Sequence, residues 1–102
     1  MSDAARPGGF VAADDGARWE YAGTLTFENA ETVLEATRTL PLPSRGVADL
    51  AGLAHADSAA LAVLLALKRR AAAEGAPIAF TSVPESLVSL ARVYGVDALV
   101  GL

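Results

Sequence analysis

The Asp57–Ser58 pair is the part of the sequence whose residue types and spacing could support specific chemistry. Ser58 opens a predicted long helix, and a serine at a helix start commonly accepts a hydrogen bond from a free backbone amide. The third residue after Ser58 is Leu61 rather than Glu or Gln, so no capping box supports this structural interpretation. The same hydroxyl would lie in the positive potential of a helix N-terminus, which favours a phosphate group or a polar partner contact. Asp57 would repel a phosphate and favour a neutral contact. The interpretations of Ser58 as a helix cap and as a binding residue both stay open.

Few other polar residues suggest catalysis or metal binding. His55 is the only histidine and there is no cysteine, which leaves no second imidazole or thiolate to complete a metal site. Asp49 and Asp57, at a predicted strand end and helix start, have ordinary structural roles. The sequence contains no Walker-type loop and no order of Ser, His and Asp that supports a hydrolase. These patterns predict a protein that is not an enzyme and needs no metal or other cofactor, with His55 as a loop residue near a partner surface.

Length and composition predict one small domain in a reducing compartment. The chain has 102 residues, of which 53% are hydrophobic and 20% are charged, enough for one packed core. The formal net charge of -4 disfavours nucleic acid as a partner, and the basic run at 68–70 is short enough for a solvated helix face. No uncharged apolar stretch approaches the ~20 residues that span a bilayer, so direct membrane insertion is not expected. The polar start lacks a signal-peptide core, which predicts a cytoplasmic protein with a disordered tip at 1–9 and a domain at 10–102.

The alternation of apolar and polar residues predicts an α/β fold. The predicted strands are 10–13, 18–22, 47–50 and 77–81, with a further extended segment at 24–26 after a bend at Gly23 and a loop after Leu50. A hairpin turn at 14–16 joins the first two strands, because Asp-Asp-Gly tolerates positive φ. The predicted helices are 29–40, 58–74 and 84–94, followed by a short terminal segment at 96–100. This order predicts a mixed sheet of about four to five strands, with an N-terminal hairpin and about three to four helices packed on it.

The first half of the predicted helix at 58–74 has no polar side, since every residue from 59 to 67 is apolar. We assign one stripe to the contact with the sheet, namely Leu61, Leu64, Leu65 and Lys68. A second stripe consists mostly of small residues, namely Ala59, Ala62, Val63 and Ala66. One interpretation is that flanking helices cover this stripe or that its exposure is harmless. The other is that it forms, together with Ser58, a flat docking surface for a partner helix.

The segment from Asp49 to Leu61 resembles the pattern of STAS domains, the fold of anti-sigma-factor antagonists. The resemblance covers roughly residues 18–100 and rests on Asp49-Leu50, Leu53, Asp57-Ser58-Ala59-Ala60-Leu61 and Gly23-Thr24-Leu25. STAS domains carry a Ser or Thr directly after an Asp where strand, loop and helix join, and Ser58 matches that position. The resemblance implies a STAS-like α/β fold and a protein-binding module. Ala60 replaces a glycine that is more frequent in the antagonists, and Ala51 replaces a frequent Ser or Thr, which weakens the implied phosphorylation switch.

The segment from Leu87 to Val96 resembles the ending of MlaB-type STAS proteins, which carry the pattern L-x-x-L-A-x-x-Y-x-V/L. Those proteins are cytoplasmic subunits of the phospholipid-transporting Mla ABC system, which maintains outer-membrane lipid asymmetry, and they bind its ATPase. The resemblance implies an accessory subunit that stabilises or regulates an ABC ATPase and reaches the inner membrane only through it. The alternative is an anti-sigma-factor antagonist that is switched by phosphorylation of Ser58. The expected partner-binding residues are His55, Asp57, Ser58, Ala59, Ala62 and Val63, with Tyr94 in a secondary interface.

Overall fold

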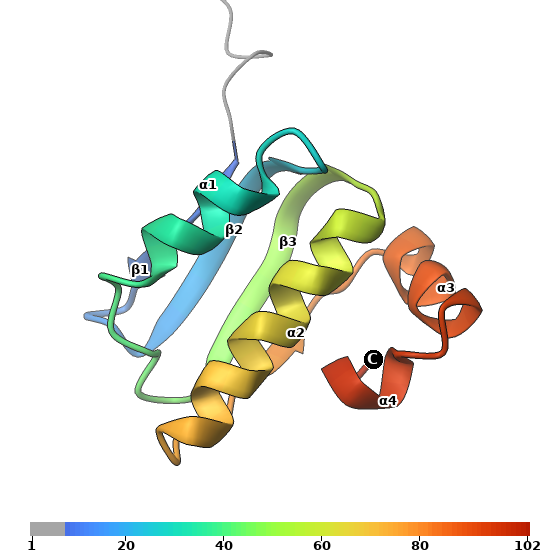
Figure 1. Cartoon of the computed structure of the whole chain (residues 1–102). Helices are drawn as coiled ribbons and strands as arrows, with labels where there is room; N and C mark the ends of the chain where they lie inside the picture. The colour runs from blue at the N-terminus through green and yellow to red at the C-terminus, as the bar shows by residue number, and fades with distance from the viewer. Residues whose placement is uncertain (1–7) are drawn as a thin grey trace, which may run out of the picture.

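Four strands form one mixed sheet in the order β1-β2-β3-β4, and helices pack against it (Figure 1). The structure is a computed structural model that describes residues 8–102. Its strands are β1 (Gly9–Ala13), β2 (Arg18–Leu25), β3 (Val47–Ala56) and β4 (Ala79–Thr81). Its helices are α1 (Ala30–Thr37), α2 (Ser58–Ala73), α3 (Glu85–Val93) and α4 (Asp97–Val100). The predicted α/β class is therefore confirmed. Most of the predicted tip at 1–9 lies outside the described residues, but Gly9 already belongs to β1.

The N-terminal hairpin is confirmed where the sequence predicts it. β1 and β2 pair antiparallel, with Val11 opposite Glu20. The residues of the connecting turn, Asp14, Asp15 and Gly16, have φ angles of 53°, 56° and 85°. Asp and Gly adopt this left-handed region more readily than other residues do, and it matches the twist of the flanking strands. β2, β3 and β4 then run parallel, which places their carboxyl ends at one edge of the sheet.

Both central strands are longer than the sequence predicts. The bend expected at Gly23 is an irregularity inside β2, which continues to Leu25. The loop expected after Leu50 is wrong, because β3 continues to Ala56 and pairs with β2 along its whole length. The β2–β3 register shifts between Glu20 and Ala22 and again between Gly23 and Thr24. Such shifts break the alternation of buried and exposed side chains, which is why the alternating pattern ends early in the sequence.

The core lies between the sheet and the two helices α1 and α2, which cover the same face (Figure 1). Trp19 and Tyr21 are buried on β2, as their alternation predicts, and Leu64 of α2 belongs to the same buried cluster. Phe10 packs edge-on against Tyr21, with ring centroids 4.8 Å apart. The C-terminal helices α3 and α4 lie beside α2, and Val100 of α4 is fully buried. The predicted terminal segment is thus a short helix that closes the side of the core.

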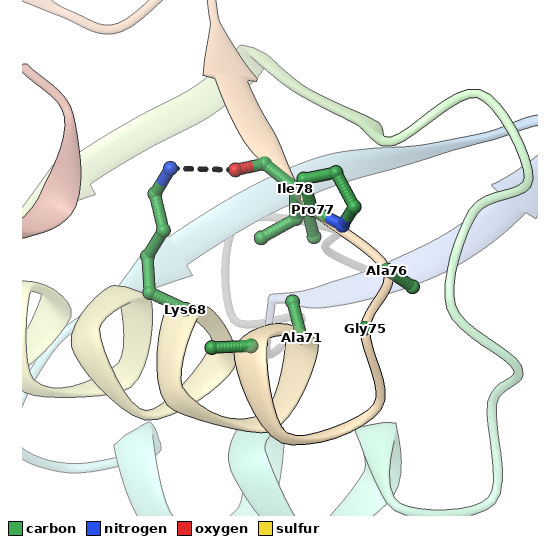
Figure 2. Close-up of a pocket in the computed structure, with 7 residues that line it drawn as sticks. Lys68, Ala71, Gly75, Ala76, Pro77 and Ile78 are labelled. Atoms are coloured by element: carbon green, nitrogen blue, oxygen red, sulfur yellow. Dashed lines mark hydrogen bonds between the residues drawn. The ribbon is translucent and has the colours of Figure 1, made fainter.

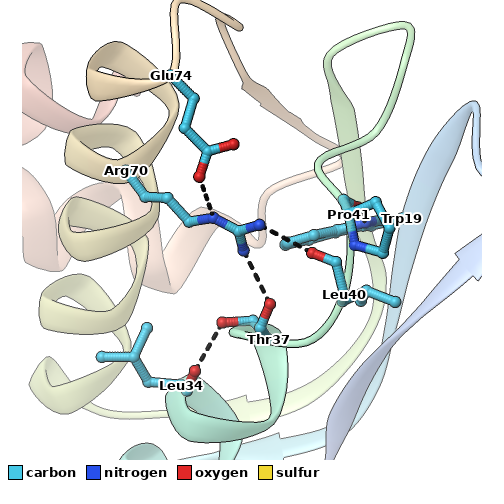
Figure 3. Close-up of polar contacts among 7 residues, drawn as sticks. All are labelled: Trp19, Leu34, Thr37, Leu40, Pro41, Arg70 and Glu74. Carbon is cyan, nitrogen blue, oxygen red and sulfur yellow. Dashed lines mark hydrogen bonds and ion pairs between the residues drawn. The ribbon is translucent and has the colours of Figure 1, made fainter.

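Arg70 fastens the end of α1 to α2 (Figure 3). Its Nη1 donates to the Thr37 carbonyl at 2.8 Å and its Nη2 to the Leu40 carbonyl at 2.9 Å, while Nε contacts Glu74. The Thr37 carbonyl belongs to the last residue of α1 and also accepts from the Leu40 amide at 3.0 Å. A cation is favourable at this end of a helix. The prediction that residues 68–70 form a solvated face is wrong for Lys68 and Arg70, because both are partly buried and bond backbone carbonyls.

Tyr21 provides a test of this core through pH. Its hydroxyl donates to the Thr24 carbonyl at 2.5 Å, and burial raises the pKa of Tyr21 to about 12. Between about pH 10 and pH 12 the unfolded chain loses this proton and the folded chain keeps it, so the free energy of unfolding should fall by about 1.4 kcal/mol per pH unit. Urea unfolding across this range should show that slope reduced in Tyr21→Phe. Equal slopes in both proteins would contradict the buried phenol.

Candidate partner-binding site

The start of α2 is capped by Asp57, not by Ser58. β3 ends at Ala56, and the Asp57 carboxylate accepts a hydrogen bond from the Ala59 amide at 2.9 Å. Asp57 has extended backbone geometry and is the N-cap, so the interpretation of Ser58 as the cap is wrong. Ser58 is the first residue of the helix, and its side chain is exposed at the carboxyl edge of the sheet. Its hydroxyl is therefore free of the capping role and available to a partner.

The predicted docking stripe on α2 is only partly accessible. Ala62 is exposed and Ala59 is partly exposed. Val63, by contrast, is only 2% exposed and belongs to the core, so its expected place on the docking surface is wrong. The reason is that α2 has buried neighbours on more than one side, because α1, α3 and α4 all contact it. An all-apolar helix segment therefore turns more of its circumference inward than a single sheet-facing stripe would need.

A groove of about 310 Å³ lies between α2 and the end of α3. Its lining residues are Ser58, Leu61, Ala62, Leu65, Tyr94 and Val96. Tyr94, expected in a secondary interface, thus lies in the same groove as Ser58 and Ala62. Leu65 was assigned to the sheet contact but is partly exposed here. We call this feature the α2–α3 groove. Its walls are almost entirely hydrocarbon, with the Ser58 and Tyr94 hydroxyls as the polar groups, which suits an apolar segment of another protein.

His55 lies outside the α2–α3 groove. It is exposed near the end of β3, not in a loop as predicted, and lines a different pocket with Pro84 and Ser86. Ser58 and His55 thus contribute to separate surfaces. A nucleophile and its general base need to be within hydrogen-bond reach of one another, and this pair gives no support to such an arrangement.

Phe27 is a surface residue that the sequence interpretation missed. It lies in the turn between β2 and α1 and is 85% exposed. Its backbone amide donates to the second Asp57 carboxylate oxygen at 3.1 Å, so this turn is tied to the start of α2. The available signal was an aromatic residue between the polar Thr26 and Glu28, immediately after an expected strand. Val93 and Leu99, on α3 and α4, are further large apolar side chains that are exposed.

The far end of α2 holds a second groove, of about 370 Å³, that has a structural explanation (Figure 2). Its one charged lining residue, Lys68, donates to the Ile78 carbonyl at 2.6 Å and also lies 5.8 Å from the ring centre of Phe80. The ammonium group is thus engaged in joining α2 to β4.

Within residues 8–102, no group of three or more His, Asp or Glu side chains is arranged to hold a metal ion. None of the described helices is both long and apolar enough to cross a membrane.

Comparison with known families identifies this arrangement. The family model described as "Mlab, STAS domain" matches residues 10–101, which include all of the strands and helices except Gly9. No curated protein matches the chain. The mixed sheet with its N-terminal hairpin agrees with the fold that the STAS resemblance implies, and the match extends through the Tyr94 segment. The chain therefore belongs to the MlaB-type STAS domain family.

Proposed function

We propose that this protein is a cytoplasmic, non-enzymatic accessory subunit that binds the ATPase of a phospholipid-transporting ABC complex and stabilises or regulates it. The observation that carries the proposal is the α2–α3 groove, which brings Ser58, Ala62 and Tyr94 together in a member of the MlaB-type family. A shallow apolar groove of this size accommodates side chains of a partner segment. The protein would reach the membrane only through its partner.

The groove offers contacts rather than reactive groups. Ala62 and Leu65 lie one turn apart on α2 and leave a low surface, while Tyr94 forms the opposite wall. Tyrosine contributes a large apolar area together with one hydroxyl, a combination that is enriched in protein interfaces. The outer rims at Ser58 and Tyr94 can each supply a hydrogen bond to fix the register of a bound helix.

Co-purification tests the proposal. The tagged full-length chain is co-expressed with the ATPase subunit of the phospholipid ABC system, and with an unrelated ABC ATPase as the control. We expect a stable complex with the former only, and a change in its ATP turnover or thermal stability when the accessory subunit is present. An ATPase that elutes separately at micromolar concentrations of both proteins would overturn the proposed function.

Substitutions at Ser58 should separate a contact from a charge effect. Ser58→Ala is expected to change the affinity for the ATPase by less than about fivefold, since only one partly solvated hydrogen bond is lost. Ser58→Asp should weaken binding by more than about fiftyfold, because a carboxylate would be desolvated at the groove rim. Its thermal unfolding should be unchanged or slightly later, since an acidic residue in the first helical turn is favourable. Titration calorimetry measures the affinities of the two variants for the ATPase. Full binding by Ser58→Asp would contradict the place of Ser58 in the partner contact.

A second candidate function is an anti-sigma-factor antagonist switched by phosphorylation of Ser58. The observation that favours it is the exposed Ser58 side chain, which does not serve as the helix cap. The adjacent Asp57 carboxylate disfavours a phosphate there. Incubation with an anti-sigma kinase and ATP, followed by intact-mass measurement of wild type and Ser58→Ala, tests this function. A phosphate adduct on wild type alone would favour the switch.

A further inference from the structure

Phe27 is the most exposed large apolar side chain among the described residues. Its exposed fraction of 85% compares with 58% for Tyr94 in the α2–α3 groove. Scattered exposure of an aliphatic residue needs no explanation, but a phenyl ring held almost entirely in water loses a large hydrophobic contribution. Aromatic residues are also strongly enriched among the anchors of protein interfaces. The surroundings of Phe27 decide whether its exposure is incidental or marks a binding residue.

The turn that carries Phe27 is held in one conformation. The Thr26 carbonyl accepts from the amides of Asn29 and Ala30 at 3.1 and 2.9 Å, and the Asn29 side chain accepts from the Thr26 amide at 2.9 Å. The Asn29 amide group also donates to the Thr24 carbonyl at the end of β2. A ring on a turn that is already ordered loses little conformational entropy when a partner covers it. The turn therefore holds the Phe27 ring in a fixed, exposed position that a partner can contact.

Asp57 joins this turn to the α2–α3 groove. One carboxylate oxygen accepts from the Ala59 amide at 2.9 Å and the other from the Phe27 amide at 3.1 Å. The residue that caps α2 is thus the residue that holds the Phe27 turn, and Ser58 follows it directly. Because both bonds use one planar group, the position of Phe27 is fixed relative to the start of the groove.

Charge around the turn selects the class of partner. Glu28 follows Phe27, Glu31 lies in the first turn of α1, and Asp57 contacts the Phe27 amide. Two arginines lie instead at the opposite ends of these helices, with Arg38 after α1 and Arg70 in the last turn of α2. An apolar ring among carboxylates complements an apolar pocket flanked by Lys or Arg, and it disfavours the anionic surface of a phospholipid bilayer.

We propose that Phe27 is a second docking residue for the same protein partner, that Asp57 is its positioning residue, and that the partner's matching surface is an apolar pocket with a basic rim. The inference rests on the proposed function, since it takes the ATPase as the partner. It extends the binding surface from the α2–α3 groove across the start of α2 to the β2–α1 turn. Asp57, expected to contact the partner directly, acts instead through the Phe27 turn.

The first experiment measures the affinity of the full chain for the ATPase in wild type, Phe27→Ala, Asp57→Asn and the double variant. Phe27→Ala should weaken binding at least about tenfold without changing thermal unfolding, because the ring supports no core contact. Asparagine is as good an N-cap as aspartate, but its amide nitrogen cannot accept from the Phe27 amide. Asp57→Asn should therefore weaken binding about fivefold in wild type and by less than about twofold in the Phe27→Ala background. Equal effects of Asp57→Asn in both backgrounds would overturn the positioning role.

A measurement on the isolated chain tests the tie between Asp57 and the turn without a partner. Amide hydrogen exchange at Phe27 should be at least about tenfold faster in Asp57→Asn, while exchange at Ala59 stays within about twofold of wild type.

Glu28→Lys tests the inferred basic rim of the partner's pocket, and Glu35→Lys is its control, with the same change of charge on α1. Within residues 8–102, the one ion pair of Glu35 is the exposed contact with Arg38, whose loss is nearly neutral. Glu28→Lys should slow association about tenfold at low salt, an effect that shrinks as salt rises, and Glu35→Lys should not.

The outcomes separate this inference from the proposed function. If wild type does not bind the ATPase, the proposed function fails and the inferred occupant fails with it. If wild type binds and Phe27→Ala binds equally, the inference alone is overturned. Flotation with vesicles of phosphatidylethanolamine and phosphatidylglycerol provides the remaining arm. Wild type should not bind these vesicles. Vesicle binding that depends on Phe27 would overturn the inferred protein partner and indicate a lipid surface as the ligand of Phe27.

Discussion

Replacing Ala62 with glutamate is expected to abolish binding of the ATPase while leaving the fold intact. Ala62 is exposed on α2 and lines the α2–α3 groove between Ser58 and Tyr94. A glutamate there would occupy the space that a partner side chain needs and would leave an unpaired charge in an apolar contact. The loss of binding free energy should be roughly 3 kcal/mol or more, which is over about a hundredfold in affinity.

Ala72→Glu is the matched control for this prediction. Ala72 is also exposed on α2, but it lies at the far end of the helix, in the groove beside Lys68. The same substitution on the same helix should leave affinity within about twofold of wild type, because no partner contact is expected there. Calorimetry measures the affinities and circular dichroism confirms the folds. Similar binding by both variants would reject the α2–α3 groove as the docking surface.

Gly52→Ala should cause a large loss of stability for the addition of a single methyl group. A Cβ atom at position 52 would lie 2.3 Å from the Tyr21 carbonyl oxygen and 3.2 Å from the Ala22 Cα. Both are backbone atoms of the neighbouring strand, so β2 itself must move. We expect unfolding to become easier by about 3 kcal/mol and the midpoint of thermal unfolding to fall by more than about 10 °C.

Gly9→Ala is the corresponding control in the edge strand β1. Among the described residues, no heavy atom other than those of Gly9 and its chain neighbours lies within 4 Å of a Cβ built at Gly9, and this glycine is not among those with positive φ. Alanine should therefore be neutral or slightly stabilising, because it restricts the unfolded chain without strain in the folded one. Thermal and urea unfolding of the two variants decide the matter. Equal midpoints would show that the irregular β2–β3 pairing accommodates a methyl group.

The parts of the fold that depend on local chemistry are predictable from the sequence. The Asp-Asp-Gly turn and the glycine after α2 supply residues that tolerate positive φ, and the proline after α1 cannot continue a helix. The elements next to them begin or end within a few residues of the expected places. The length of β3 was not predictable in this way. Its second half pairs with β2 through register shifts and consists largely of Ala and Gly, whose side chains give little alternation of hydrophobicity.

The candidate site shows a similar division. The place of Ser58 at the start of α2 follows from local pattern, and Tyr94 was expected from the family resemblance. That these two line one groove depends on how α3 packs against α2, which no local pattern specifies. Val63 was misplaced because a helix that is apolar on every side does not reveal how many neighbours it has. Phe27 was missed because only the tertiary structure shows that its side chain is exposed.

The hairpin turn at Asp14–Gly16 has a practical consequence for every binding measurement on this protein. It lies at the amino end of β2, whereas Phe27 and Ser58 lie at the carboxyl ends of the strands. Asp14 and Asp15 are exposed, and loop tips of this kind accept inserted residues well. A cysteine introduced at Asp15 would be the single thiol in this sequence, which contains no cysteine of its own. A fluorophore can therefore be attached at that position alone. Such a probe should report diffusion and complex size from the edge of the sheet that faces away from the docking surface.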